Sequence, residues 1–132
     1  MAAFPEDGPD GPDLLDVARR RLVDELLPLL PADRRLDVLM IANATGIAAR
    51  ESRSGESELR AALARLAALY DQAEEASSVD DARDRLSLLN RRLAADIRAG
   101  VFDAGPKRGA LTNHLRATTR ARLAITNPKV LE

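Results

Sequence analysis

The sequence predicts an all-α protein, a compact bundle of four to five helices. Apolar residues recur every three or four positions along most of the chain, and no stretch alternates in the way of a β-strand. Hydrophobic residues reach 45% of the composition but aromatic residues only 2%. The core must therefore consist of Leu, Ala, Ile and Val side chains, which suit close packing between helices.

The length of 132 residues favours one domain. Residues 1–12 are acidic and rich in Gly and Pro, a composition typical of a disordered leader. We expect a single helical domain over residues 13–128 and a short C-terminal tail over residues 129–132.

The first helix is expected to begin at Asp13 as its N-cap, with an apolar stripe that continues to Leu29. Pro28 disfavours helical geometry at Leu27, so this helix should end or kink there.

The central helix is expected over residues 33–51. It contains the segment VLMIANATGIAA, twelve residues without a charge, in a chain of which 31% is charged. Such a segment has no water-facing side at helical spacing, so this helix should be the most enclosed of the bundle. The polar stretch SRSG, Ser52 to Gly55, is expected to form the loop that ends it.

Three further helices follow in the pattern. One covers residues 56–72. The next begins at a capping box formed by Ser78 and Asp81, with Asp in place of the usual Glu or Gln, and ends at Gly100. The last covers residues 107–126 and ends before the Asn127-Pro128 pair.

Composition narrows the function classes. The chain has no cysteine, which excludes disulfides, thiolate metal sites and cysteine nucleophiles. The uncharged segment is shorter than the 20 or so residues that span a bilayer, so we expect no membrane partner and a cytoplasmic location. Residues 1–81 carry a net charge of −8 and residues 82–132 a net charge of +7. This division indicates either acidic helices packed beside basic ones or a basic face for an anion. The scarcity of aromatic residues and the lack of a binding motif argue against nucleic acid.

No familiar catalytic constellation is present. The sequence contains no GxSxG elbow, no HExxH pair and no phosphate-binding glycine loop, and its acidic pairs lack the spacing of a calcium site. We therefore expect no catalytic residue, no metal and no cofactor. His114, the only histidine, is expected at the surface because general-base chemistry needs an orienting partner and a nucleophile.

Two groups of residues are candidates for ligand binding. Asn43 and Arg50 lie seven residues apart on one face of the central helix, where they form either a polar pair at a cleft or a satisfied amide with an exposed arginine. The second group lies in the last helix. Lys107 stands at its start, where a cation opposes the helix dipole and an anion is favoured, and Arg116 and Arg120 lie one turn apart. Ordinary surface charge is the alternative explanation for this group.

Arg122 lies in the middle of the stripe that Leu111, Leu115, Thr118 and Ile125 form on the last helix. A cation in that position should either extend to water or pair with a buried carboxylate. We expect a structural ion pair with Glu51, with Asp16 as the other candidate partner.

Three segments carry a resemblance to a family: VLMIANATGIAARES, LNRRLAADIRAG and HLRATTRARLAITNP. Together they resemble a small bacterial all-helical family of unknown function, over much of residues 13–130. Such proteins are typically encoded near a phosphotransferase-like kinase and an acyl-CoA dehydrogenase. The resemblance therefore implies a role beside acyl-CoA metabolism, but it implies no activity.

Two functions remain open at this point. One is a non-catalytic accessory or interaction protein, which forms a homo-oligomer or binds a protein partner such as the kinase. The other is a small-molecule binding module for an anionic acyl ligand such as acyl-CoA. An enzyme is the least supported class.

Overall fold

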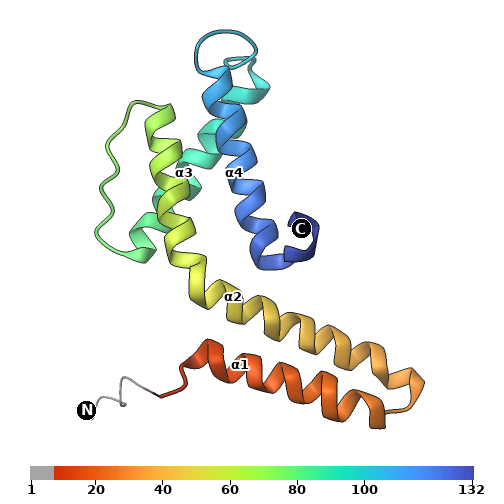
Figure 1. Ribbon diagram of the computed structural model, residues 1–132. Helices are drawn as coiled ribbons and strands as arrows, with labels where there is room; N and C mark the ends of the chain where they lie inside the picture. The colour runs from red at the N-terminus through yellow and green to blue at the C-terminus, as the bar shows by residue number, and fades with distance from the viewer. Residues whose placement is uncertain (1–7) are drawn as a thin grey trace. The chain divides into compact units, whose positions relative to one another are not determined.

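The computed structural model describes residues 8–132, which form four α-helices joined by segments of about ten residues and contain no strand. The all-α prediction is confirmed. The helices are α1 (Gly11–Arg20), α2 (Ala32–Leu69), α3 (Val79–Arg98) and α4 (Arg108–Thr126), and a short 3-10 turn, Pro128–Leu131, follows α4 (Figure 1).

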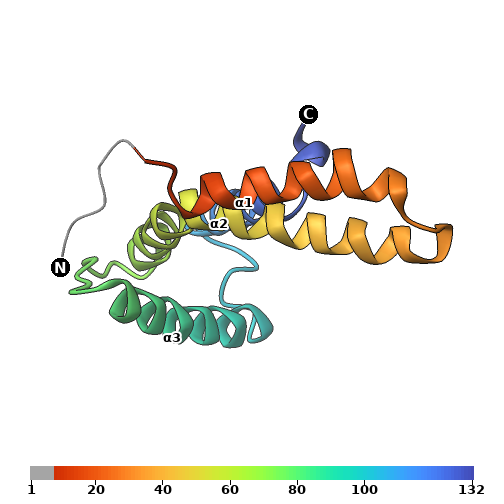
Figure 2. The same ribbon diagram turned by 90° about the horizontal axis from the view of Figure 1, so that it is seen from below.

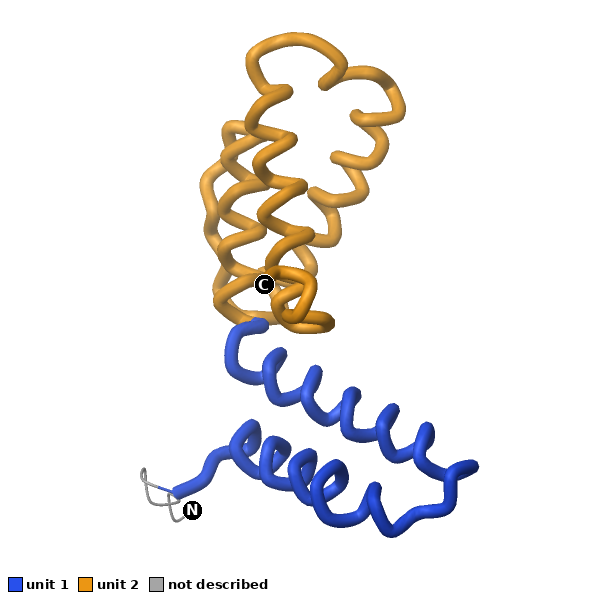
Figure 3. Tube along the Cα trace, turned by 45° about the vertical axis from the view of Figure 1, so that its right-hand side comes forward, with its two compact units in different colours: residues 1–55 blue, residues 56–132 orange. Residues whose placement is uncertain are grey.

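The chain divides into two compact units, Met1–Gly55 and Glu56–Glu132 (Figure 3). The expectation of a single domain over residues 13–128 stays a prediction. Part of the expected leader, residues 1–7, lies outside the described residues, whereas Gly11 and Pro12 already belong to α1.

The first unit is a helical hairpin in which α1 lies beside the first part of α2 (Figure 1, Figure 2). Asp10, not Asp13, caps α1: its carboxylate accepts a hydrogen bond of 2.9 Å from the Asp13 N–H. The N-cap prediction was wrong because Asp13 already lies in the first helical turn. There its carboxylate is free to contact Arg53 of α2 at 3.0 Å.

The expectation that Pro28 disfavours helical geometry at Leu27 was wrong: Leu27 has helical angles, φ −52° and ψ −44°, and the chain first becomes extended at Leu30, before Pro31. The α-helix gives way after Arg20 to one turn of π-helix, Arg21–Leu26, and then to a 3-10 turn, Leu27–Leu29, that contains Pro28. Leu30 is extended, with φ −90° and ψ 147°, as expected for a residue that precedes a proline.

A stripe of small residues lets the two helices of the hairpin approach. Ala42, Gly46 and Ala49 are the buried residues on the first part of α2. A Cβ at position 46 would lie only 3.2 Å from the Arg19 side chain, so the glycine makes room for the stem of that arginine. The Arg53 guanidinium also holds Asp16 at 2.8 Å, and this hydrogen bond, with a second one to Asp13, raises the pKa of Arg53.

The expectation that the central helix is the most enclosed was wrong. Leu39, Met40 and Ile41 are 46%, 64% and 54% exposed, although they lie within the uncharged segment. The hairpin has only one helix to offer as a neighbour, so it can bury one side of α2 and leaves the other apolar residues exposed.

The expected loop at Ser52 to Gly55 was also wrong, because α2 continues through it to Leu69. The polar residues there lie on the helix surface and satisfy their groups locally. The Ser54 hydroxyl donates to the Arg50 carbonyl at 2.9 Å, and Arg60 pairs with Glu56 one turn away at 3.2 Å.

The second unit consists of the last part of α2 together with the whole of α3 and α4, and these helices pack around one apolar core (Figure 1). Its buried cluster consists of Leu66, Leu69, Leu93, Phe102 and Leu111, with Tyr70, Leu86 and Leu89 against it. Tyr70 contacts Phe102 edge to face at 6.4 Å between ring centroids. Its hydroxyl donates to Asp96 at 2.7 Å, and burial together with this bond raises the pKa of Tyr70 to about 12.

Two helices of this unit end in the same way, on a residue with positive φ. Gly100, with φ 76°, ends α3 as predicted, and the N–H of Val101 donates to the Asp96 carbonyl at 3.0 Å. Asp71, with φ 54°, ends α2, where the N–H of Gln72 donates to the Ala67 carbonyl at 2.9 Å.

The start of α3 confirms the predicted capping box. The Ser78 hydroxyl accepts a hydrogen bond of 3.1 Å from the Asp81 N–H. The Asp81 carboxylate accepts one of 2.8 Å from the backbone N–H of Ser77, one residue earlier than in the usual motif.

Candidate functional site

Three polar side chains of the second unit have buried polar atoms, although only His114 is buried as a whole residue. They are Arg65 of α2 and His114 and Thr118 of α4. His114 is 4% exposed, although it is a histidine among leucines and alanines. His114 and Thr118 lie one turn apart on the same side of α4.

Each of these three side chains has at least one buried polar atom without a hydrogen-bond partner within residues 8–132. Arg65 Nε and Nη2, His114 Nδ1 and Thr118 Oγ1 are buried atoms without a hydrogen-bond partner there. Burial without a partner costs about 1–3 kcal/mol for a neutral polar group and more for a charged one. Polar atoms left in this state call for an explanation, because buried polar groups are normally hydrogen-bonded.

The charge of Arg65 acts on His114. Burial lowers the pKa of His114 below its usual value of 6.5, and the positive charge of Arg65 lowers it further. The imidazole is therefore neutral at pH 7, and Arg65 is the source of positive charge in the cluster.

The prediction that His114 lies at the surface was wrong. The buried residues of α4 are Leu111 and His114, whereas Leu115 is 44% exposed. In the second turn of α4 the inward side is thus rotated from Leu115 to His114. The predicted stripe of Leu111, Leu115, Thr118 and Ile125 keeps a helical period when His114 replaces Leu115, so the sequence allowed either residue to face inward.

The same rotation bears on Arg122. Arg122 is exposed in the second unit and Glu51 is exposed in the first. Neither charge is buried, so the reason for expecting a buried ion pair is lost, and the pairing itself stays a prediction.

The five predicted ligand-binding residues are divided between the two units. Asn43 and Arg50 belong to the first unit, where Asn43 is exposed and Arg50 is half-buried near Gly46. Arg116 and Arg120 are exposed on α4 of the second unit.

Lys107 has a structural contact. Its ammonium donates to the Leu69 carbonyl at 2.8 Å and to the Asp71 carboxylate at 2.6 Å. The cation thus lies at the C-terminal end of α2, where the helix dipole favours positive charge. The sequence analysis missed this contact of Lys107 with the end of α2.

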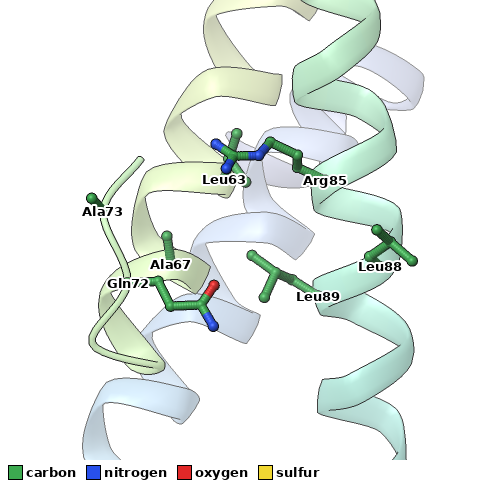
Figure 4. A pocket seen from close by; sticks show the side chains of 7 residues that line it. All are labelled: Leu63, Ala67, Gln72, Ala73, Arg85, Leu88 and Leu89. Carbon is green, nitrogen blue, oxygen red and sulfur yellow. The ribbon is translucent and has the colours of Figure 1, made fainter. Parts of the chain in front are cut away.

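Two hollows lie on the second unit. The smaller, about 150 Å³, is lined by Leu63, Ala67, Gln72, Ala73, Arg85, Leu88 and Leu89 (Figure 4). The Arg85 guanidinium in it already donates to the Glu75 carbonyl of the preceding loop. The larger, about 310 Å³, follows α4 along Thr118, Thr119, Arg122, Leu123 and Thr126. It therefore begins at a member of the buried polar cluster.

A second feature lies on the first unit, where large apolar residues are exposed. Along α2, Leu36, Met40, Asn43 and Ile47 follow one another at intervals of four, three and four residues. We call these four residues the α2 seam. At 100° per residue they lie on one side of the helix, away from the side that Ala42, Gly46 and Ala49 bury against α1.

Residues 8–132 contain no group of three His, Asp or Glu side chains that could hold a metal ion. None of their helices is long and apolar enough to cross a bilayer.

The fold and these features define a small all-helical protein with a half-buried arginine whose charge acts on a buried histidine, and with an exposed apolar seam. A family model, domain of unknown function DUF6285, matches residues 28–130, and the chain belongs to that family. The match includes all of α2, α3 and α4. Searches of the curated proteins and of the solved structures find no match.

Proposed function

We propose that the protein is a non-catalytic interaction protein that associates through the α2 seam. The observation that carries the proposal is the exposure of apolar residues on the helical hairpin. Eight large hydrophobic side chains of residues 8–55 are 46% to 79% exposed: Leu14, Val17, Leu26, Leu29, Leu36, Leu39, Met40 and Ile41. Two of them, Leu36 and Met40, belong to the α2 seam, and exposed apolar side chains that lie together favour a surface that another molecule covers.

The α2 seam has the pattern of a helix-to-helix contact. Alternating steps of four and three residues place Leu36, Met40, Asn43 and Ile47 at the positions that a neighbouring helix meets in a coiled coil. Leu36 is 66% exposed and Met40 64% exposed, so the outer part of the seam is open. The small residues of α2 already face α1, which leaves the seam for a partner.

A second copy of the chain is the partner that this pattern favours. A single asparagine within an apolar seam is a known device for fixing the register of identical helices, because the two amides can hydrogen-bond to each other. Asn43 is the only polar residue among the four and is exposed. Against an unrelated apolar surface the same amide would lose its water contacts without return.

The mass of the protein in solution tests this proposal. We expect sedimentation equilibrium to show a reversible dimer for the unaltered protein. Met40→Glu should shift it to the monomer, since it places two like charges in one seam. Ile41→Glu is the matched control: residue 41 is similarly exposed but lies 100° away around the helix. A monomer at all concentrations, or equal loss of the dimer in both variants, would refute self-association through the seam.

The family resemblance adds a second protein to the experiment. We propose the phosphotransferase-like kinase as the partner to test first if the chain proves monomeric, with a role beside acyl-CoA metabolism in a bacterial cytoplasm. The lack of cysteine fits a reducing compartment. A complex with the kinase that Met40→Glu abolishes and Ile41→Glu retains would assign the seam to that partner.

A further inference from the structure

We propose that Arg65, His114 and Thr118 form a binding site for an oxyanion, the carboxylate or phosphate group of a small molecule. The rest of the ligand lies in the hollow along α4. This site belongs to the second unit and does not depend on the association proposed for the α2 seam.

The two unpartnered atoms of Arg65 carry the first part of the argument. Nε and Nη2 lie on the same edge of the guanidinium, and neither has a hydrogen-bond partner among the described residues. Their N–H bonds are parallel and match the spacing of two oxygens of a carboxylate or phosphate. This edge of Arg65 is therefore built for bidentate contact with an oxyanion.

The surroundings of Arg65 also favour an anion. None of the ion pairs formed by residues 8–132 includes Arg65, so its positive charge is not neutralised by a carboxylate of the described chain. The Thr118 hydroxyl can donate a third hydrogen bond, and the neutral imidazole of His114 can donate from Nδ1 in one tautomer. One bound oxyanion would satisfy all four unpartnered atoms and the charge together.

The hollow along α4 can hold the part of the ligand that lies beyond its anionic group. Thr118 belongs both to the buried cluster and to the lining of the hollow of about 310 Å³. That volume is at the lower end of the range for small-molecule sites. Its lining adds two threonines, a leucine and the exposed cation Arg122, so it suits a small molecule of mixed polarity with its anionic group at Arg65.

The single histidine makes the proposal directly testable, because its imidazole signals in an NMR spectrum need no assignment. Unaltered protein is titrated with inorganic phosphate and, separately, with acetate, at constant pH and with ionic strength held by chloride. We expect a saturable shift of the His114 signals and a rise in Tm with at least one of the two anions. The responding anion identifies the carboxylate or the phosphate class.

Two variants and a control separate binding from general ionic effects. Arg65→Met should abolish the saturable shift and keep the fold, since an apolar residue of similar size replaces an unpaired, half-buried cation. Thr118→Val should weaken the affinity for the anion about tenfold, because one hydrogen bond to it is lost. Arg91→Met removes an exposed cation of α3 and should leave the titration unchanged.

The proposal is overturned if neither anion gives a saturable shift. It is equally overturned if Arg65→Met responds as the unaltered protein does. Should Arg65→Met fail to fold, Thr118→Val decides: affinity equal to that of the unaltered protein excludes the cluster as the site.

Discussion

At the scale of single residues, the backbone of Gly100 has a left-handed conformation that strongly favours glycine. Its φ is 76°, and a Cβ there would lie 2.9 Å from the Asp103 carboxylate. We predict that Gly100→Ala lowers the free energy of unfolding by about 1–2 kcal/mol, the usual cost of a side chain in this conformation. Urea denaturation measures the loss. Gly109→Ala, in α4 with nothing within 4 Å of the added Cβ, is the control and should raise stability slightly. Equal effects of the two changes would contradict the prediction.

The buried His114 predicts a dependence of stability on pH. Its pKa is lowered in the folded state from the usual 6.5, so below that pH the unfolded chain binds a proton that the folded chain does not. The free energy of unfolding should therefore fall as pH decreases from about 6.5, by at most about 1.4 kcal/mol per pH unit from this one group. The loss should stop once the pH passes the folded pKa.

Urea denaturation at a series of pH values between neutrality and the range in which carboxylates titrate measures this effect. His114→Gln, which cannot be protonated, should have a flatter profile in the same range. A variant profile as steep as that of the unaltered protein would assign the acid sensitivity to other groups.

The residues that sequence reasoning placed well are those whose role is local. Gly100 and the Ser78–Asp81 pair were predicted because capping depends on neighbours within a few positions. His114 and Lys107 were missed because their contacts come from residues far along the chain. The partner of Lys107 is the end of α2, 38 residues away, and no periodic pattern shows such a distance.

At the scale of elements, α2 continues through Ser52 to Gly55. Substitutions at Gly55 should therefore change stability in the way expected for a helix and not for a loop. A helical glycine with exposed surroundings costs about 1 kcal/mol relative to alanine. The nearest atom to an added Cβ at Gly55 is Glu51 Cγ at 3.2 Å, part of an exposed side chain that can move aside.

Gly55→Ala should therefore raise the free energy of unfolding by up to about 1 kcal/mol, and Gly55→Pro should lower it by about 3 kcal/mol or more. Thermal and urea denaturation measure both changes. Indifference to proline at this position would show that the helix is interrupted there in solution.

Helix existence was predictable and helix boundaries were less so. The expected helices over residues 33–51 and 56–72 are one helix, because serine, arginine and glycine are typical of a loop in the sequence but here lie exposed or half-buried along α2. The burial of the uncharged segment was misjudged for a related reason. A pattern shows which residues are apolar, whereas the number of neighbouring helices decides which of them are covered.

At the scale of the whole molecule, association through the α2 seam makes stability depend on concentration. A partner that binds only the folded chain raises Tm by mass action, so Tm should rise with protein concentration. Met40→Glu should remove the concentration dependence and Ile41→Glu should preserve it. Calorimetry over a wide concentration range measures the trend, and a constant Tm in the unaltered protein would contradict self-association.

The role of Asn43 in that association predicts a substitution that strengthens the association, whereas Met40→Glu weakens it. If the two amides meet across the contact, they cost stability relative to an apolar pair but hold the two copies in one register. Asn43→Leu should therefore strengthen association and broaden the distribution of species, with dimers joined by larger oligomers in native mass spectra and sedimentation profiles. Asn43→Gln, a larger amide that fits the seam less well, should weaken the dimer without adding species. A sharper single dimer from Asn43→Leu would show that the asparagine does not select the register, and the seam would then specify its partner through Leu36, Met40 and Ile47 alone.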